Sequence, residues 1–209
     1  MNKAVGQETV VVVQRCPELS ATGWDELLSG LPDTDRIRIN KLHRSVDRQN
    51  SATGWHLLHQ LGRDWGATVR RAASGRPYAE PPVDASMSHS GRWVAVALCR
   101  TGRIGIDVET VRPVTPSLAE RCLSPDELAW MREVEAGAAQ NHRFFRLWTA
   151  KEAHLKATGV GLSADPRRIR IDCAGEKPVM VGRAAQAWRL SCASPAAGVC
   201  VSVCMERAG

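Results

Sequence analysis

The sequence predicts an α+β fold: a pseudo-twofold pair of similar α/β halves, each with a small, mainly antiparallel sheet packed on helices. Two observations support this prediction. Strand-like and helix-like segments follow one another in the same order in both halves, with a junction near residues 111–117. The 209 residues are 44% hydrophobic and 24% charged, which suits a folded core. We expect an N-terminal half over residues 1–112 and a C-terminal half over 113–209.

The first half alternates apolar runs with polar, helix-forming stretches. Leucines recur at helical spacing in its long central region, and a run of Val and Ala residues near its end is typical of a buried strand. The expected segments are a strand at 10–16, a short helix at 24–28 capped by Thr22, a long helical region from 31 to 65, a loop at 74–77 extended by 81–82, and strands at 93–98 and 104–110.

The second half begins with a clear helix start. Ser124 is followed by Pro at the first helical position and by two acidic residues in the first turn. The expected segments are a helix through 130–134, a long helix at about 140–158, and strands at 168–173, 178–181, 188–192 and 199–204. No low-complexity stretch and no residue-level repeat accompanies this similarity of order.

The charge of the chain favours anionic partners. Lys and Arg number 28 against 22 Asp and Glu, a formal net charge of +6, and the isoelectric point is about 9.2. The excess is modest and spread along the chain, so we expect no nucleic-acid partner. No run is long and apolar enough to span a membrane, so we expect no membrane partner either.

The cysteines and the N-terminus indicate a cytoplasmic protein. The apolar run at 10–13 is too short for a signal segment. Seven cysteines, without any C-x-x-C spacing, predict reduced thiols. Cys192, Cys200 and Cys204 could be imagined as metal ligands, but free cysteines are usually small apolar core residues, and we expect that here.

Two acidic stretches carry the chemistry. Residues 148–156 are typical of a helix, in which Glu152 and Lys156 are four apart and share one face. A surface ion pair would explain this spacing alone. The stretch 105–109 is typical of a strand that points Asp107 and Glu109 to one side. Together the three carboxylates could enclose Mg²⁺, which prefers carboxylate oxygens and substrate phosphate.

Weaker signals lie upstream in the same order. Taken alone, His89 within Ser88-His89-Ser90 is typical of a structural histidine, and Gly75-Arg76-Pro77 of a turn. The ordered set of motifs resembles the Sfp-type 4′-phosphopantetheinyl transferases, which load the phosphopantetheine arm of coenzyme A onto carrier proteins. The resemblance rests on Gly75–Pro77, Ser88–Val94, Ile104–Glu109, Leu123–Glu127 and Phe145–Lys156, followed by Gly159–Leu162, and covers about residues 31–165.

The resemblance implies a fold of two α+β halves with coenzyme A and the active site at their junction. It implies Asp107, Glu109 and Glu152 as Mg²⁺ ligands, with Lys156 neutralising the pyrophosphate of coenzyme A. Ser88 and His89 would meet the 3′-phosphate, and Arg76 stands where the family often has Lys. The implied coenzyme A contacts are Arg36, Arg48, Gly75, Arg76, Pro77, Ser88, His89, Ser90, Asp107, Glu152 and Lys156.

The implied reaction is attack of a carrier-protein serine on the phosphorus next to the pantetheine arm, with adenosine 3′,5′-bisphosphate leaving. A base must take the serine proton, and both Glu152 and Glu127 are candidates. Two positions depart from the family pattern: Asn50 stands where Arg is common, and Ser86 where Asn is favoured. Both concern coenzyme A contacts, so we expect altered affinity rather than lost chemistry.

The implied partner is an acyl or peptidyl carrier protein, whose acidic helix suits a positive enzyme. We expect a monomer that docks the carrier through exposed apolar residues near 111–125. Fatty-acid, polyketide and nonribosomal-peptide carriers all remain open, as does acceptance of acyl-coenzyme A. One alternative is a homologue that binds coenzyme A or a carrier without catalysis. A nucleic-acid protein is a third class, suggested by charge alone.

Overall fold

The computed structural model describes residues 2–5, 8–80, 83–161, 164–173, 175 and 178–207. The expected loop at 81–82 and residue 162 of the family motif lie outside these ranges. The chain forms two compact units, Met1–Arg100 and Thr101–Gly209. The division therefore falls before the expected boundary at 112, because the strand Ile104–Thr110 pairs with a strand near the C-terminus and belongs to the second unit.

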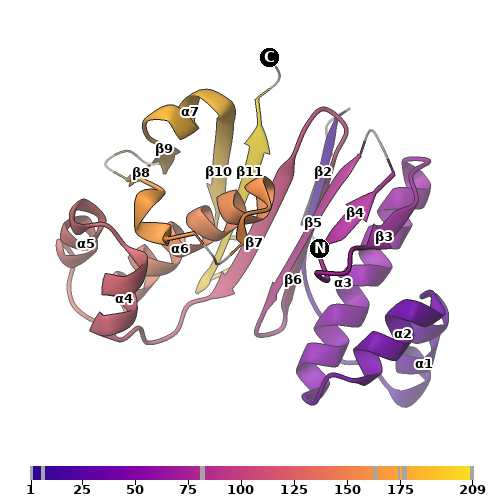
Figure 1. Cartoon of the computed structure of the whole chain (residues 1–209). Helices are drawn as coiled ribbons and strands as arrows, with labels where there is room; N and C mark the ends of the chain where they lie inside the picture. The colour runs from indigo at the N-terminus through magenta and orange to yellow at the C-terminus, as the bar shows by residue number, and fades with distance from the viewer. Residues whose placement is uncertain are drawn as a thin grey trace. The chain divides into compact units, whose positions relative to one another are not determined.

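The first unit is a four-stranded antiparallel sheet covered by helices (Figure 1). Its strands, in spatial order, are β1 (Asn2–Val5), β2 (Thr9–Arg15), β6 (Trp93–Cys99) and β5 (Asp84–Ser90). The helices are α1 (Ala21–Ser29), α2 (Asp33–Asn40) and α3 (Ser45–Asp64), and a small hairpin joins β3 (Val69–Arg71) to β4 (Pro77–Ala79).

The core of this unit forms between α3 and the sheet. Trp55 and Leu58 of α3 are fully buried with Val94 and Val96 of β6. The polar stretch 47–50, which the sequence placed between apolar segments, lies inside α3. The cap of α1 is Ser20 and not Thr22, because the hydroxyl of Ser20 precedes the helix and accepts a hydrogen bond from the Gly23 amide at 3.1 Å.

The second unit repeats this plan with three strands. Its antiparallel sheet has the order β10 (Trp188–Ala193), β11 (Val199–Glu206) and β7 (Ile104–Thr110), and the 21-residue helix α6 (Ala138–Thr158) lies across one face (Figure 1). The smaller elements are α4 (Pro116–Cys122), α5 (Pro125–Arg132), η2 (Pro166–Arg168), β8 (Ile171–Asp172), β9 (Val179–Met180) and α7 (Arg183–Ala187). The predicted α+β class is confirmed.

All seven cysteines are free thiols, as the sequence predicts. Six are buried and Cys192 is half-buried. Burial raises the pKa of Cys173, Cys200 and Cys204 to about 12. Cys200 and Cys204 belong to the buried core of the second unit, and Cys192 packs against it.

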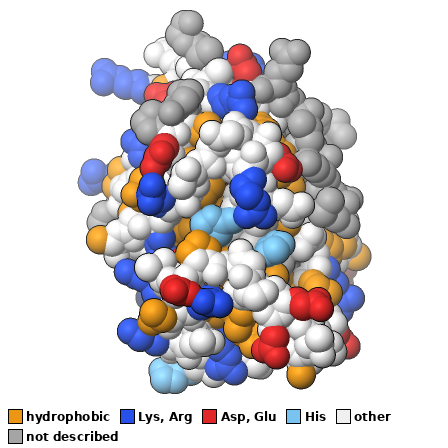
Figure 2. Space-filling view, turned by 90° about the vertical axis from the view of Figure 1, so that its right-hand side faces the viewer, with side chains coloured by type: hydrophobic (Ala, Val, Ile, Leu, Met, Phe, Trp, Pro, Cys, Tyr) orange, Lys and Arg blue, Asp and Glu red, His pale blue; other side chains and the backbone are white. Residues whose placement is uncertain are grey.

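The distribution of charged side chains on the surface agrees with the modest basic excess of the sequence, which is spread along the chain. Figure 2 shows Lys and Arg side chains interspersed with Asp and Glu on the face turned to the viewer. Within the described ranges, no helix is long and apolar enough to cross a membrane.

The backbones of α6 and β7 approach each other closely at Gly105. A Cβ atom on this glycine would lie 2.0 Å from the Ala153 carbonyl oxygen and 2.4 Å from the Ala157 amide nitrogen. Both are backbone atoms, so no side-chain rotation can relieve the clash. Glycine is therefore required here for the helix to lie against the strand.

We predict that Gly105→Ala lowers the free energy of unfolding by about 3 kcal/mol or more, because the helix must move off the sheet to admit the methyl group. The measurement is chemical denaturation followed by circular dichroism. Gly23→Ala is the matched control, since its Cβ would meet no atom closer than 3.5 Å. Equal stability of the two variants would contradict the proposed role of Gly105.

Candidate active site

The acidic side chains of β7 point toward α6. Gly105, Asp107 and Glu109 alternate with Ile104, Ile106 and Val108 along the strand, and the close contact at Gly105 shows which side faces the helix. Asp107 is only 4% exposed, so the acidic face is covered rather than solvated. The strand predicted at 104–110 is confirmed in extent, and its carboxylates lie beneath the long helix.

The carboxylates of β7 are held by cations. The Lys156 ammonium on α6 donates a 2.7 Å hydrogen bond to Oδ1 of Asp107. Glu109 accepts from the Arg112 guanidinium at 2.8 Å, and Arg112 also lies over the Phe145 ring at 4.7 Å from its centroid. The strand and the helix, 49 residues apart in sequence at the Asp107–Lys156 contact, are thus joined by charge as well as by backbone contact.

Glu152 completes the cluster. Its Oε1 atom is buried and has no hydrogen-bond partner among the described residues. Burial, followed by the negative charges of Asp107 and Glu109, raises the pKa of Glu152 to about 7, while Lys156 opposes the rise. Glu152 therefore interacts electrostatically with both Asp107 and Glu109. The three carboxylates are not arranged around a common metal position, since Asp107 and Glu109 are turned to Lys156 and Arg112.

The long helix ends directly after these residues. Gly159 adopts a left-handed conformation with φ of 74°, and its amide donates to the carbonyls of Leu155 and Lys156. The Gly159 stop predicted from the sequence is confirmed, and it fixes the last turn that carries Lys156.

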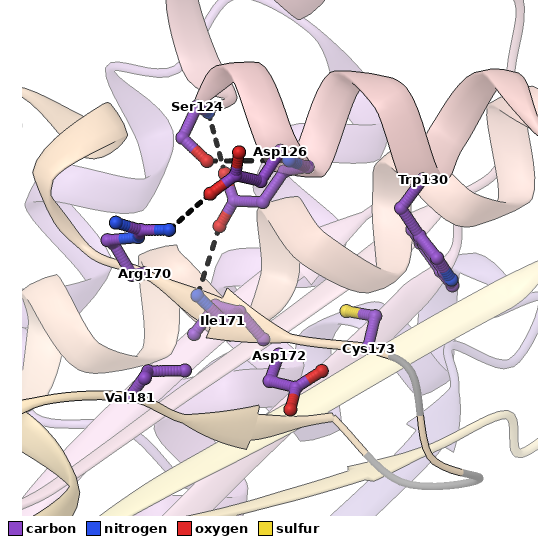
Figure 3. Close-up of a pocket in the computed structure, with 9 residues that line it drawn as sticks. Ser124, Asp126, Trp130, Arg170, Ile171, Asp172, Cys173 and Val181 are labelled. Carbon is purple, nitrogen blue, oxygen red and sulfur yellow. Dashed lines mark hydrogen bonds and ion pairs between the residues drawn. The ribbon is translucent and has the colours of Figure 1, made fainter.

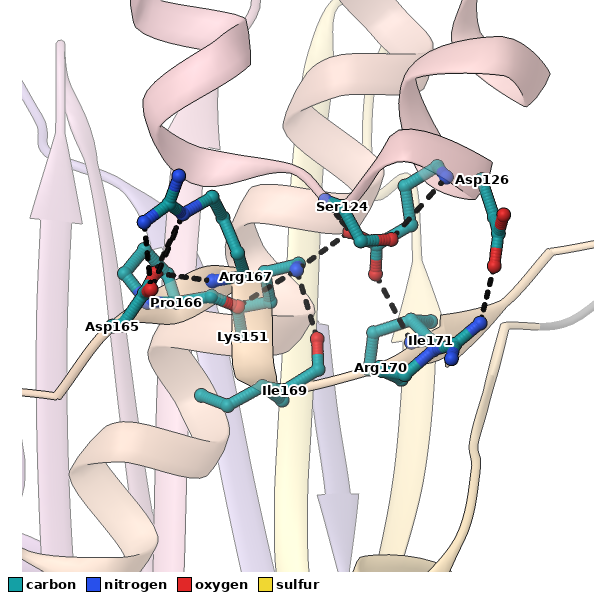
Figure 4. A network of polar contacts seen from close by, with 10 residues as sticks. Ser124, Asp126, Lys151, Asp165, Pro166, Arg167, Ile169, Arg170 and Ile171 are labelled. Atoms are coloured by element: carbon teal, nitrogen blue, oxygen red, sulfur yellow. Dashed lines mark hydrogen bonds and ion pairs between the residues drawn. The ribbon is translucent and has the colours of Figure 1, made fainter.

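Glu127 occupies a different, structural environment. It lies in the first turn of α5 and is 4% exposed. Its Oε2 atom accepts from the Ser124 amide and from the Lys151 ammonium, each at 2.7 Å, and Oε1 accepts from the Ile171 amide at 3.1 Å (Figure 4). Both oxygens are engaged in contacts that hold the fold.

A cavity of about 320 Å³ lies beside Glu127. Figure 3 shows Trp130, Ile171, Cys173 and Val181 around it, with the Asp126–Arg170 ion pair at its edge. None of Asp107, Glu109, Glu152 or Lys156 lines this cavity. It is therefore separate from the acidic cluster at α6 and β7.

The other predicted site residues lie in the first unit. Ser88 is buried on β5 while His89 is exposed. Arg76, beside Gly75 and Pro77 at the start of β4, binds the Asp84 carboxylate at 3.1 Å. Ser90 ends β5. The hairpin turn that follows His89 begins at Gly91, with φ of 59°.

Two helical arginines of the first unit are engaged locally. Arg36 of α2 is paired with Asp33 one turn earlier. Arg48 of α3 donates to the carbonyls of Leu42 and His43 at 2.8 and 3.1 Å, and so closes the connection between α2 and α3.

Asn50 has a supporting place behind the Ser88-His89 strand. Its side chain is 1% exposed and donates to the Gly91 carbonyl at 2.8 Å. Asn50 therefore holds the β5–β6 turn. The sequence showed only that Asn50 stands where the family commonly has arginine, and it did not predict this role.

The segment expected to dock a carrier protein does not present large exposed apolar side chains. Val111, Val114 and Leu118 pack against the core of the second unit, and Leu123 is buried. Among the described residues the exposed large hydrophobic side chains are elsewhere, at Ile37, Leu42, Tyr78, Val160, Val179 and Val181.

Sequence reasoning missed Lys151 and Arg112. Lys151 is 0% exposed, and its ammonium is bound by Glu127 at 2.7 Å. Ser124 and Glu127 have the spacing of a capping box, which marks the start of a helix but does not identify Lys151 as the partner of Glu127. No sequence signal marks Arg112 as the partner of Glu109.

Comparison with known proteins gives the family. The model of the 4′-phosphopantetheinyl transferase superfamily matches residues 103–204. A 4′-phosphopantetheinyl transferase from Bacillus subtilis is 38% identical over 153 residues, covering 69% of this chain and 67% of that protein. The 4′-phosphopantetheinyl transferase HetI from Nostoc sp. (strain PCC 7120) is 38% identical over 178 residues, covering 79% and 74%.

A solved structure adds a weaker likeness. The holo-[acyl-carrier-protein] synthase of Thermotoga maritima is 22% identical, with a TM-score of 0.43 over 51% of this chain and 64% of that one. The assignment rests on the sequence relatives. The chain belongs to the 4′-phosphopantetheinyl transferase superfamily, and the resemblance that its motifs indicate is confirmed. It is accordingly an enzyme of the transferase class.

We predict that Glu152→Gln stabilises the metal-free protein above pH 7 by roughly 1–3 kcal/mol, since each pKa unit corresponds to about 1.4 kcal/mol. The folded-state pKa of Glu152, about 7, is higher than the usual glutamate value of 4.5. The folded state thus binds the proton more tightly, and stability is lost as pH rises through that interval. Thermal unfolding of both proteins from pH 4 to 8 measures the difference, which should vanish below about pH 4.5. A constant difference at all pH values would contradict the raised pKa.

Proposed function

We propose that the chain transfers the 4′-phosphopantetheine arm of coenzyme A to a serine of an apo carrier protein, in an Mg²⁺-dependent reaction that releases adenosine 3′,5′-bisphosphate. The observation that carries this proposal is the gathering of Glu152, Asp107 and Lys156 where α6 meets β7. Membership of the 4′-phosphopantetheinyl transferase superfamily supports the assignment of phosphopantetheine transfer to that cluster.

The donor types of these residues suit a magnesium ion, and binding it would require Asp107 and Glu109 to turn from Lys156 and Arg112 toward a shared position. Asp107, Glu109 and Glu152 supply the hard carboxylate oxygens that Mg²⁺ prefers. The Oε1 atom of Glu152 is buried without a hydrogen-bond partner, and burial, followed by the negative charges of Asp107 and Glu109, raises the pKa of its carboxyl group to about 7. A divalent cation would relieve both conditions. When bound, Mg²⁺ would neutralise charge on the pyrophosphate of coenzyme A.

Lys156 would supply a second positive charge. Its ammonium now lies 2.7 Å from Asp107, at the end of α6. We propose that it binds a pyrophosphate oxygen of coenzyme A. There its positive charge would stabilise the transition state, in which the leaving phosphate develops negative charge.

The proton of the carrier serine requires an acceptor, and contacts in the second unit favour Glu152 over Glu127. Both oxygens of Glu127 already accept hydrogen bonds from the Ser124 amide, the Ile171 amide and Lys151. Glu152 keeps one oxygen without such a partner. In the proposed reaction the serine oxygen bonds to the phosphorus next to the pantetheine arm. The phosphorus–oxygen bond to the adenosine bisphosphate breaks, and the serine proton passes to the Glu152 carboxylate.

We further propose that the first unit binds the nucleotide end of coenzyme A. The exposed His89 and the neighbouring Ser88 and Ser90 on β5 would meet the 3′-phosphate. Arg76, with Gly75 and Pro77 beside it, would grip phosphate with its guanidinium fork. Arg36 and Arg48 complete the proposed basic contacts. Asn50 supports the β5–β6 turn and would act on affinity through His89 rather than by touching the ligand.

We predict that the purified protein, with Mg²⁺ and coenzyme A, adds the mass of phosphopantetheine to an apo carrier protein. Asp107→Asn and Glu152→Gln should each lower kcat by about 100-fold or more, because each removes a charge that acts in the transition state. Intact-protein mass spectrometry against time gives the rates.

Glu120→Gln is the matched control for these variants. Glu120 is a carboxylate of the same unit, 58% exposed in its side chain and paired with Arg132 at 3.5 Å. It should transfer at the wild-type rate. Binding of coenzyme A without any product over hours would support instead a non-catalytic homologue.

A further inference from the structure

A buried ion pair lies on a different side of α6 from the one that carries Glu152. Lys151 directly precedes Glu152 in α6 and is 0% exposed, one of the largest fully buried side chains. Neighbouring helical residues point about 100° apart, so Lys151 turns into the second unit while Glu152 turns toward β7. Lys151 therefore cannot reach a phosphate of a bound substrate.

All three protons of the Lys151 ammonium have an acceptor. Its Nζ atom lies 2.7 Å from Oε2 of Glu127 and 2.8 Å from the carbonyl oxygens of both Pro166 and Ile169 (Figure 4). A neutral amine could donate only two hydrogen bonds, so this arrangement selects the charged form. Burial lowers the pKa of Lys151, and the Glu127 carboxylate opposes that change.

Glu127 connects the same ammonium to two further elements. It closes the capping box of α5 with Ser124, and it accepts from the Ile171 amide at the start of β8. The pair thus ties α6 to α5, to η2 and to β8 within one buried network. The ion pairs around it, Asp126 with Arg170 and Asp165 with Arg167, lie at the surface and contribute little by comparison.

Two contacts on different sides define the position of α6. On the sheet side, Gly105 lets the helix backbone approach β7 closely. On the other side, Lys151 is anchored to Glu127 and to the carbonyls of the 166–169 segment. Along α6, Glu152 lies between Lys151 and Ala153, whose carbonyl meets Gly105, and a small rotation of the helix would carry its carboxylate away from Asp107.

We propose that Lys151 and Glu127 form a positioning pair that sets the rotation of α6 and so holds Glu152 and Lys156 against β7. Its effect on turnover rests on the proposed transferase function, whereas the positioning is a property of the folded chain alone. Glu127 then acts through Lys151 and not as the base of the reaction.

The test compares Lys151→Met, Glu127→Gln and the double variant. Each single change breaks the same contact and leaves a buried charge without its partner. Each should lower kcat at least tenfold and by a similar factor, with the KM for coenzyme A changed less than twofold. The double variant should be no slower than the slower single variant, because the two changes disrupt one interaction.

Hydrogen exchange of the α6 amides, in the absence of coenzyme A and Mg²⁺, gives a readout that does not depend on activity. Both single variants should speed exchange at residues 150–156 at least tenfold. Met180→Ala is the matched control, since Met180 is a 6% exposed core residue of the same unit outside the network. It should lower the thermal midpoint while leaving that exchange and kcat unchanged.

Several outcomes would overturn the proposal. Loss of turnover in Glu127→Gln together with wild-type kcat in Lys151→Met would make Glu127 the base. Normal kcat and normal α6 exchange in both single variants would show that the pair stabilises the fold without positioning α6. If a single variant fails to fold, the double variant, which buries no lone charge, decides through its exchange. If the wild type modifies no carrier, the proposed function fails, and exchange alone still decides the positioning.

Discussion

The backbone contact between α6 and β7 is the constraint on which the second unit depends. At Gly105 the strand and helix backbones approach so closely that a methyl group would lie 2.0 Å from the Ala153 carbonyl. This places the next residues of the strand, in particular Asp107, directly beneath the helical turn that carries Glu152 and Lys156. One glycine thus brings charged side chains of two distant segments together.

The charges gathered by this contact are costly for the folded protein. Asp107 is buried beside the half-buried Glu152, and burial, followed by repulsion from Asp107, raises the pKa of Glu152. Lys156 and Arg112 offset part of it. Under the proposed function, a bound cation would offset the same repulsion, and the lost stability would be the cost of that function.

The sequence predicted the periodic elements well and the supporting contacts poorly. The alternation of 104–110 and the long helix up to Gly159 follow from local side-chain pattern and capping, which a single sequence contains. The role of Asn50 behind the β5–β6 turn and the Glu127–Lys151 pair depend on partners 41 and 24 residues away, which no local rule identifies. The unit boundary was placed too late for the same reason: the pairing of β7 with β11 is a long-range contact.

The burial of the cysteines bears on the substrate. The phosphopantetheine arm that this family transfers ends in a thiol, and a thiolate on the enzyme could exchange with its disulfide forms. Six of the seven enzyme thiols are buried, and the pKa of Cys173, Cys200 and Cys204 is raised to about 12. Thiols held protonated and out of reach are poor nucleophiles. Oxidised coenzyme A should therefore form no mixed disulfide with the six buried thiols.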